Sequence, residues 1–569
     1  MARPREGEEL KRTIRQRGDK FYAYEITSVM ENGRKKTVSK YLGRVDPESG
    51  KLLEKIPEKS AENRRKIAEE RTIQTLKDIR VADYGGVYLL DGIQRKIKLG
   101  EDLNTSFGTT SETMLTLAFA LVQCGGVFSA VEGTLKKTWS KELYGTAGIY
   151  DSGTLSKFTH DIGVEAQANI EKFFECRIKR NKGLLAWDTT TIGCHSDMDG
   201  MAEYVRSNKD HEDLKQVNVG FATDMRGVPL MYRQYSGNVS DMDTMKLLAK
   251  EIINYGGAEA LFVLDRGFCS GWNVWFLLKS GIKFVMPATT SSQAVKKLFT
   301  EFNSVKEIET KEHNKRMYKV WKTELGINKA EGRTKADGDQ AYMFTNSGTM
   351  DFDSEGKVTA YVCYDTKKYS DEMQSHLAMI SSLLEAAEKI DAADPVAAFK
   401  KKAGKAIKHF NVTANGRKVV VSVKKNSASF EENRAGIFVM LASEDVDWKT
   451  VMIAYDARRL TEQGFDRKKG ENGRFNTSDK ETMKGREFLR FLDLTLRCEI
   501  SAEIRECDMI QPPTAEEAIA ILNCIQVREY KGTRFVTEVD KKQRDLLKLF
   551  NLQVPKEALT NVPVFDLPQ

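Results

Sequence analysis

The chain contains no stretch of about 18 uncharged apolar residues, the length that a membrane-spanning helix needs. Its first residues, MARPREGEELKRTIRQRGDK, are charged and lack the apolar segment of a secretory signal. Only 11 of its 569 residues are Pro, and no long polar tract interrupts it, which leaves little room for extended disorder. These absences predict a folded cytoplasmic protein that does not enter a membrane.

Motifs for zinc and nucleotide binding are missing as well. The eight Cys residues form no C-x-x-C pair, and the six His residues form no H-E-x-x-H motif. We therefore expect reduced thiols rather than a disulfide framework or a zinc site, and oxygen atoms as the ligands of any metal ion. The absence of G-x-x-x-x-G-K-[ST] argues against ATP dependence.

Positive charge is concentrated at the beginning of the chain. Residues 1–80 contain 21 Lys and Arg against 14 Asp and Glu, an excess equal to the formal net charge of +7 of the whole chain. Such an excess is typical of a module that binds a polyanion. A solvated charged surface is the alternative, and the count alone does not separate the two.

The order of strand-like and helix-like patterns indicates an α/β core. Three strand patterns in hairpin order begin with GLLAWDTTTIG, and a helix over 241–255, a strand, a second helix and a further strand follow. This is the order found in a ribonuclease-H-like fold. A long segment of mixed β and helical patterns then precedes the strand GIFVMLAS and another helix, so we expect a separate unit inserted into the host fold.

Two aspartates each end an apolar, strand-like run. Asp188 follows GLLAW and Asp265 follows ALFVL. Considered by itself, Asp188 is more simply interpreted as a turn or helix-cap residue than as a metal ligand. Asp265 has the alternative of pairing with Arg266, although adjacent strand residues point to opposite faces. Two aspartates at strand ends and a glutamate on a helix would together suit a divalent cation.

One stripe of the helix predicted near the end of the chain has an unusual composition. Tyr455, Arg458, Glu462 and Lys469, in YDARRLTEQGFDRKK, follow one another at steps of 3, 4 and 7 residues, which places them on one helical face. A core-facing helix carries Leu, Ile or Val at such positions, whereas this stripe carries two cations and a carboxylate. It suits a helix that faces a polyanion across a metal ion. The alternative for Arg458 is a salt bridge with Glu462, one turn away.

These four residues match a Y-(2)-R-(3)-E-(6)-K signature, and the chain resembles the DDE transposases of bacterial insertion-sequence elements that carry it. WDTTT resembles the family block around the first aspartate, LDRGFCSGWNVWFLLKSGIKFVMP resembles the block around the second, and YSGNVSD resembles a further recurring segment. The N-terminal YAYEITS and KYLGRVDPESG resemble a subgroup with a β-rich N-terminal module. Arg459 departs from the family, in which Trp is common at this position.

The resemblance implies a cut-and-paste transposase that binds terminal inverted repeats and catalyses metal-dependent strand cleavage and strand transfer. Asp188, Asp265 and Glu462 would be the catalytic and metal-binding residues, with two Mg²⁺ or Mn²⁺ ions per active site. The DNA-binding residues would include Tyr455, Arg458 and Lys469. The resemblance further implies target DNA as a partner, a homodimer that bridges two DNA ends, hairpin-ended intermediates and a nucleoid-associated location in the bacterial cytoplasm.

One aromatic residue is a candidate for a further DNA contact. In related transposases a base beside the cut is flipped out and stacked on an aromatic residue of the insertion. Trp321, in MYKVWKTEL, is the candidate in this chain. A buried core tryptophan is the alternative.

The expected fold class is α/β, with a ribonuclease-H-like catalytic core interrupted by a β-rich insertion domain, an N-terminal β/helical DNA-binding region and a helical C-terminal region. The expected parts are a basic N-terminal module (1–80), a helical DNA-binding region (81–182), the first part of the core (183–290), the insertion domain (291–435), the second part of the core (436–500) and the C-terminal region (501–569). Two other functions stay open. One is a catalytically silent, transposase-derived DNA-binding protein, against which the three retained carboxylates argue, and the other is a stand-alone metal-dependent DNA nuclease.

Overall fold

The protein divides into two compact units. The first comprises Met1–Arg80 and Arg528–Thr533, and the second comprises Val81–Val527 and Arg534–Gln569. The computed structural model describes residues 11–31, 34–53, 61–146, 148, 150–181, 183–194, 215–236, 241–257, 259–290, 292–334, 340–346, 355–469, 479–507 and 511–564.

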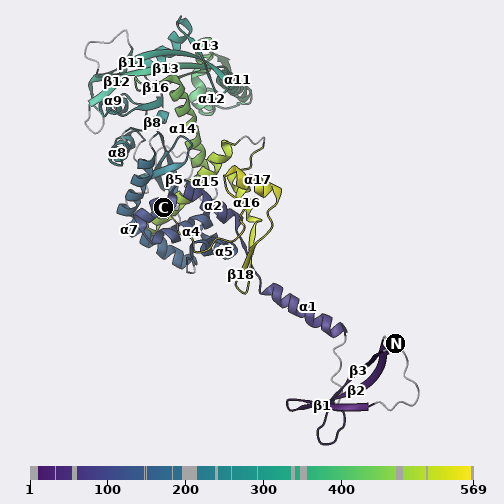
Figure 1. Ribbon diagram of the computed structural model, residues 1–569. Coiled ribbons are helices and arrows are strands. Elements are labelled where there is room, and N and C mark those ends of the chain that lie inside the picture. Colours follow the sequence, from purple (N-terminus) through teal and green to yellow (C-terminus); the bar gives the residue numbers. More distant parts are fainter. Residues whose placement is uncertain are drawn as a thin grey trace. The chain divides into compact units, whose positions relative to one another are not determined.

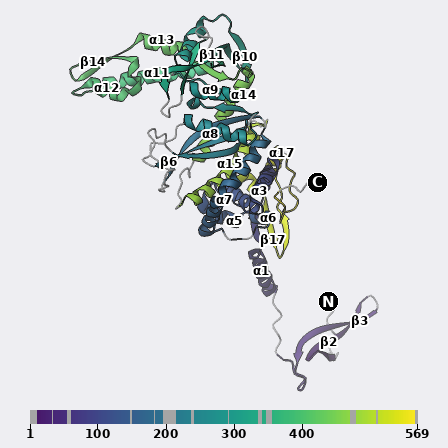
Figure 2. The same ribbon diagram turned by 90° about the vertical axis from the view of Figure 1, so that its left-hand side faces the viewer.

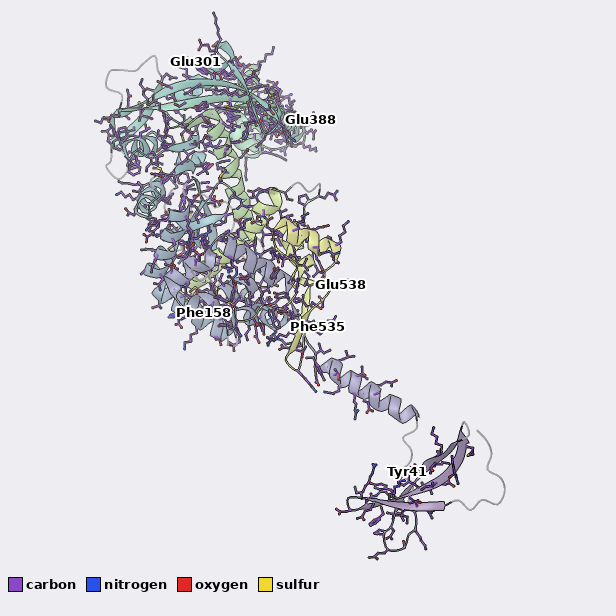
Figure 3. The ribbon with its side chains drawn as sticks, in the orientation of Figure 1. Tyr41, Phe158, Glu301, Glu388, Phe535 and Glu538 are labelled. Atoms are coloured by element: carbon purple, nitrogen blue, oxygen red, sulfur yellow. The ribbon has the colours of Figure 1, made fainter. Side chains whose placement is uncertain are left out.

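The first unit contains a three-stranded antiparallel sheet and a helix, namely β1 (Lys11–Arg17), β2 (Lys20–Glu31), β3 (Arg34–Val45) and α1 (Ala61–Lys77). The predicted hairpin of β2 and β3 is confirmed, whereas Asn32 and Gly33 of its predicted turn lie outside the described residues. β1 is an additional strand, whose charged sequence KRTIRQR carries no strand signal. The ring of Tyr41 (Figure 3) lies 5.5 Å from that of Tyr24 on the neighbouring strand.

A ten-stranded sheet forms the centre of the second unit (Figure 1). Its strands are β5 (Leu184–Cys194), β6 (Lys215–Thr223), β7 (Pro229–Ser236), β8 (Leu261–Leu264), β9 (Phe284–Pro287), β10 (Glu309–His313), β11 (Arg316–Thr334), β12 (Gln340–Asn346), β13 (Gly356–Asp365) and β16 (Ile437–Ala442). They are ordered β10-β11-β13-β16-β9-β8-β5-β6-β7, and β12 pairs with β11. β8 pairs in parallel with both β5 and β9, whereas β6 pairs antiparallel with β5 and β7.

The succession of elements expected after Leu184 is confirmed. β5, β6 and β7 follow one another as antiparallel neighbours, and helix α8 (Asp241–Asn254), β8, helix α9 (Gly271–Lys279) and β9 come next. The strand expected over GLLAWDTTTIG is confirmed as β5, and Asp188 lies within it, six residues before its end at Cys194. The β-branched run Thr189–Ile192 sustains its pairing with β6 after the pairing with β8 has stopped.

The long segment before β16 does not form a wholly separate unit. Its strands β10, β11, β12 and β13 extend the same sheet, because β13 pairs with β16 from Thr359↔Ala442 to Tyr364↔Ile437. The expected β-rich insertion also contains several helices, among them α10 (Gln293–Glu301) and α13 (Lys425–Arg434). The strands of this segment therefore share the hydrophobic core of the host sheet.

A small lobe within this segment has a core of its own. We call it the hairpin lobe, and it consists of α11 (Thr366–Glu388), α12 (Pro395–Ala403), the 3-10 turn Gly404–His409, β14 (Phe410–Asn415) and β15 (Lys418–Val423). β14 and β15 form a separate two-stranded sheet. Phe399, Phe410 and Val419 are buried between this sheet and the helices. Figure 2 shows α12 and β14 beyond the strands of the large sheet, and Figure 3 labels Glu388 at the end of α11.

The two faces of the large sheet are covered by different helices. Helix α14 (Trp448–Lys469) covers one face, where Val451 and Ala454 join a buried cluster with Ala186 of β5 and Val263 of β8. The largest buried cluster lies on the other face, where α7 (Ser152–Arg180) and α15 (Lys480–Arg505) pack against β7. The sheet is thus buried on both sides around β5 and β8, as strands with parallel neighbours require.

The remaining helices and strands of the chain flank α7 and α15 in the sequence. They are β4 (Arg80–Asp83), α2 (Gly85–Lys96), α3 (Leu99–Phe107), α4 (Thr110–Gln123), α5 (Val131–Lys137), α6 (Ser140–Tyr144), α16 (Ala515–Asn523), β17 (Gln526–Tyr530), β18 (Thr533–Val536) and α17 (Lys541–Leu549). The C-terminal region is therefore not purely helical, because it includes β17 and β18. Among the described helices, none by itself is long and apolar enough to cross a membrane, although α4 and Phe128–Lys137, bent by 104°, meet the length and composition limits as a pair.

Two glycines allow α7 and α15 to approach closely. A Cβ atom added at Gly485 would lie 1.8 Å from the carbonyl oxygen of Thr159, and one added at Gly163 would lie 1.9 Å from that of Glu481. Both obstacles are backbone atoms, which cannot turn aside as a side chain can. The spacing of these two helices therefore depends on the absence of side chains at both positions.

Gly485→Ala is expected to destabilise the second unit by about 1–3 kcal/mol, since the added methyl group forces the two helices apart. The matched control is Gly133→Ala in α5, where an added Cβ meets no atom within 4 Å. The control should gain up to about 1 kcal/mol, because Ala favours helix more than Gly does. Thermal and chemical unfolding of both variants would measure this. Equal stability of the two variants would contradict the close-approach argument.

Candidate active site

Asp188 and Asp265 occupy equivalent positions on neighbouring parallel strands. β5 and β8 pair from Leu184↔Leu261 to Trp187↔Leu264, and the two aspartates are the next residues on their strands. Neighbouring strands lie about 4.8 Å apart, so the backbones of the two aspartates are adjacent. The structure thus brings together two carboxylates that are far apart in the sequence.

Both carboxylates face the side of the sheet that α14 covers. Ala186 and Val263, two residues before them, are buried together with Ala454 of α14. Because side chains alternate along a strand, Asp188 and Asp265 belong to the same face. Both are half-buried, so water and a bound cation can reach them.

Asp265 is tied both to its own turn and to α14. Its Oδ2 accepts a hydrogen bond from the backbone N–H of Gly267 at 3.1 Å, and its Oδ1 forms an ion pair with Nη1 of Arg458. The Arg458 side chain is 20% exposed, so this contact is only partly screened by water. A described partner of Arg458 is therefore Asp265, whereas Glu462, the partner considered from the sequence, has a side chain outside the described residues.

Asp188 and Tyr455 have neighbours that fix their orientation. Asp188 Oδ1 accepts a hydrogen bond from the backbone N–H of Thr189 at 2.7 Å. The Tyr455 ring stacks on Phe438 of β16 at 5.6 Å, and the Arg458 guanidinium lies 5.9 Å from the centre of the Tyr455 ring. A contact of Tyr455 with DNA stays a prediction, and the stacking leaves the ring half-buried.

Glu462 and Lys469 lie on α14, as the helical spacing predicted. Glu462 follows Arg458 by four residues, about one helical turn, and so continues the stripe that carries Ala454 and Arg458. Lys469 is the last residue of the helix. The side chains of both residues lie outside the described residues, so their proposed roles stay predictions.

Trp321 lies on β11, on the other face of the sheet. Its neighbour Val320 is buried in the cluster that includes α14, whereas Trp321 packs half-buried against the cluster on the opposite face. The two carboxylates and Arg458 are therefore on one face and Trp321 is on the other. Its stacking on a flipped base stays a prediction.

His313 and Asn314 together bind Asp456 of α14, and we call this contact the clamp. No pattern in the sequence predicts it. His313 Nε2 lies 2.7 Å from Asp456 Oδ2, and Asn314 Nδ2 donates to the same oxygen at 2.7 Å. His313 is the last residue of β10, and Asn314, with a φ of 49°, begins the turn to β11. The partners are 143 and 142 residues apart, so only the fold relates them. The clamp holds the helical turn that contains Tyr455 and Arg458.

The donor set at this face suits a hard divalent cation. Carboxylate oxygens of Asp188 and Asp265 are ligands that Mg²⁺ and Mn²⁺ accept, and the ion pair with Arg458 marks a place where negative charge is balanced by a cation. Burial raises the pKa of the Cys269 thiol, four residues after Asp265, to about 11, so this thiol is protonated at neutral pH. A separate group, His160, Asp479 and Glu481, also has ligand atoms within 4.8 Å of one another, but Asp479 already caps α15 by accepting from Thr482.

The clamp is expected to contribute to stability through a charge-assisted hydrogen bond. His313→Ala and Asp456→Ala should each lower the free energy of unfolding by about 1–2 kcal/mol. Combining them in a double-mutant cycle should give a coupling energy of about 1 kcal/mol, because each single change removes the same contact. Denaturant unfolding of the four proteins would measure it. A coupling energy near zero would show that the two residues do not interact in solution.

Comparisons with known proteins bear on this site. The profile of the family described as "Transposase DDE domain" matches residues 179–492, more than half of the chain. This match includes both aspartates, Arg458 and Glu462. Among solved structures, the chain is similar to one titled "Cryo-EM structure of piggyBac transposase synaptic complex with hairpin DNA", at 10% identity and a TM-score of 0.21, over 65% of this chain and 63% of that chain. No curated protein matches the chain. The chain belongs to the family of proteins with a transposase DDE domain.

Proposed function

We propose that the protein is a metal-dependent cut-and-paste DNA transposase that cleaves DNA at the ends of its own element and joins them to target DNA. The observation that carries the proposal is the juxtaposition of Asp188 and Asp265 under the helix that contains Glu462, within the matched DDE domain. Residues 183–290 and 436–500 would be the two parts of a ribonuclease-H-like catalytic core. The strand order β7-β6-β5-β8-β9, with its parallel pairs at β5/β8 and β8/β9, supports that proposal.

The three carboxylates would hold the divalent ions of the reaction. A pair of Mg²⁺ or Mn²⁺ ions supplies activation of the attacking oxygen and stabilisation of the leaving oxygen in phosphodiester cleavage. Asp188 and Asp265 offer oxygen ligands from adjacent strands, and Glu462 would complete the set from α14. Held on two strands and a helix that share one core, the ligands would keep their geometry while DNA enters and leaves.

Arg458 would have two partners in the course of the reaction. Without DNA it balances the charge of Asp265. With divalent ions held by this carboxylate, the guanidinium would be available to donate two hydrogen bonds to a phosphate of the DNA end. Tyr455, whose ring lies against Arg458, and Lys469 at the end of α14 would contact neighbouring phosphates.

The partners in this proposal are double-stranded DNA and a second copy of the chain. Residues 1–180, with the basic excess in their first part, would bind the terminal inverted repeats. A homodimer would bridge two DNA ends, and the reaction would take place at the nucleoid of a bacterial cytoplasm. The chain would thus combine sequence recognition and catalysis in one polypeptide.

Replacing each carboxylate by its amide tests the catalytic assignment. Asp188→Asn, Asp265→Asn and Glu462→Gln should each lower strand cleavage by at least about 10²-fold, the size of a lost electrostatic contact in a transition state. DNA binding should be nearly unchanged, because the shape of each side chain is kept. Asp445→Asn is the control, since Asp445 pairs with Lys283 outside the site. Full cleavage in Mg²⁺ by any of the three variants would remove that residue from the site.

Lys469 and Glu462 should differ in what they bind. Their Cα atoms are about 10 Å apart along the helix at 1.5 Å per residue, too far for both to serve one metal pair. Glu462→Ala should weaken Mn²⁺ binding, whereas Lys469→Ala should leave it intact and lower the salt dependence of DNA binding by roughly one counterion. Mn²⁺ titration and a salt series of DNA affinity would measure both effects. Loss of Mn²⁺ affinity with an unchanged salt slope in Lys469→Ala would contradict the assignment.

A further inference from the structure

One stretch of the chain is rich in positive charge and contains no acidic residue. Between Pro395 and Phe430 there is no Asp or Glu, and there are nine Lys and Arg, two more than the formal net charge of +7 of the whole chain. They are Lys400, Lys401, Lys402, Lys405, Lys408, Arg417, Lys418, Lys424 and Lys425. The stretch runs through most of the hairpin lobe, far in sequence from the basic residues 1–80.

Most of this charge is exposed and has no carboxylate partner among the residues that the structure describes. All nine side chains are exposed. Lys408 pairs with Glu431 at 3.2 Å, and Arg417 pairs with Asp391 at 2.5 Å. The other seven make no ion pair with any residue in the part of the chain that the structure describes. Lys400, Lys401 and Lys402 lie in the last turn of α12, where the helix dipole stabilises positive charge.

The hairpin of β14 and β15 has one buried face and one open face. Phe410↔Val423 and Ala414↔Val419 are cross-strand pairs of the inner face, which closes the core of the lobe. The alternate pairs Asn411↔Ser422, Thr413↔Val420 and Asn415↔Lys418 therefore form the outer face. These six outer residues are all exposed, and they offer amide, hydroxyl and ammonium groups but no carboxylate.

Exposed lysines and a polar, carboxylate-free face of a two-stranded sheet together match the surface of double-helical DNA. The major groove of B-DNA is about 12 Å wide and admits a two-stranded β-ribbon. Amides and hydroxyls on such a ribbon would face base edges, which carry both donors and acceptors, and lysines of α12, the helix that packs behind the ribbon, would face the phosphates that border the groove. An acidic protein partner would complement only the positive charge of this surface, and the amides and hydroxyls of the outer face would have no role in binding it.

We propose that the outer face of β14–β15 is a DNA-binding surface distinct from the candidate active site, with the ribbon in a major groove and Lys400, Lys401, Lys402 and Lys405 against the adjoining phosphates. The proposal rests on the proposed transposase function and adds a binding site for duplex DNA within the hairpin lobe. The lobe has its own hydrophobic core, so it presents the ribbon as a rigid surface. Figure 2 shows β14 and α12 at the outer end of the lobe, away from the strands of the large sheet.

The test compares two triple variants of the full chain that remove the same charge. Lys400→Gln/Lys401→Gln/Lys402→Gln alters the end of α12, and Lys541→Gln/Lys542→Gln/Lys548→Gln alters exposed lysines of α17 as a control. Affinity for a 30-base-pair DNA duplex of arbitrary sequence is measured over a salt series. The α12 variant should bind at least about tenfold more weakly and show a salt slope lower by roughly two to three, whereas the α17 control should change less than about twofold.

A second variant tests entry of the ribbon into the groove. Thr413→Glu places a carboxylate in the centre of the exposed outer face, where it leaves the core of the lobe untouched. It should weaken DNA binding at least about tenfold, while Thr413→Ser, which keeps the hydroxyl, should bind like the unaltered chain. Double-stranded RNA should bind more weakly than DNA, because its major groove is too narrow to accept a ribbon.

Three outcomes would overturn this proposal. The first is equal DNA affinity of the α12 and α17 variants, and the second is equal binding of RNA and DNA duplexes. The third is competition by polyglutamate as effective as that by DNA, which would assign the surface to an acidic protein. If metal-dependent cleavage by the unaltered chain persists in any of these cases, only the lobe proposal fails. Failure of the unaltered chain to bind or cleave any DNA would refute the proposed function as well.

Discussion

The hydrogen bonds between the parallel strands β5 and β8 hold Asp188 and Asp265 at the same level of the sheet. A shift of one residue in this register would turn one of the two carboxylates to the opposite face, because side chains alternate along each strand. The register is maintained by burial on both sides: Ala186 and Val263 pack under α14, and Trp187 and Leu264 pack on the other face. The candidate site thus depends on burial of the two residues that precede each aspartate.

Helix α14 connects this constraint to the rest of the site. Its sheet-facing side is apolar as far as Ala454 and Ala457, and then changes to Arg458 where the sheet presents Asp265 instead of Val263. Along one face of α14, the N-terminal part therefore belongs to the hydrophobic core and the part from Arg458 onward belongs to the candidate site. Packing of the apolar part of α14 against the sheet fixes the position of its polar part, so the groups that would bind a charged substrate are held in place by the core.

The sheet also relates the candidate site to the hairpin lobe. β13 joins the host sheet through β16, and the lobe begins with α11 directly after β13. A DNA duplex on the outer face of β14–β15 would therefore be held by an element continuous with the sheet that carries Asp188 and Asp265. Positive charge in two separate stretches, residues 1–80 and the acid-free stretch from Pro395 to Phe430, is consistent with a protein that contacts more than one length of DNA.

The sequence by itself determined the succession of elements from β5 to β9, the helix α14 and the candidate residues. Apolar runs that end at Asp188 and Asp265 and the helical spacing from Tyr455 to Lys469 are local patterns, and local patterns predict strands and helices well. They indicated the succession from β5 to β9 and the helix that carries Glu462. The strand expected over GLLAWDTTTIG agrees with β5, whereas the pairing of Thr189–Ile192 with β6 is a property of the neighbouring strand that the run itself does not encode.

Only the tertiary structure decided which residues meet. The partner of Arg458, the clamp of His313 on Asp456, the face on which Trp321 lies and the union of β13 with β16 all join segments separated by many residues. Such contacts form where burial of apolar surface on both faces of one sheet has aligned the segments, and no local pattern encodes that alignment. Local sequence thus determines what each segment is, whereas the shared core determines what it touches.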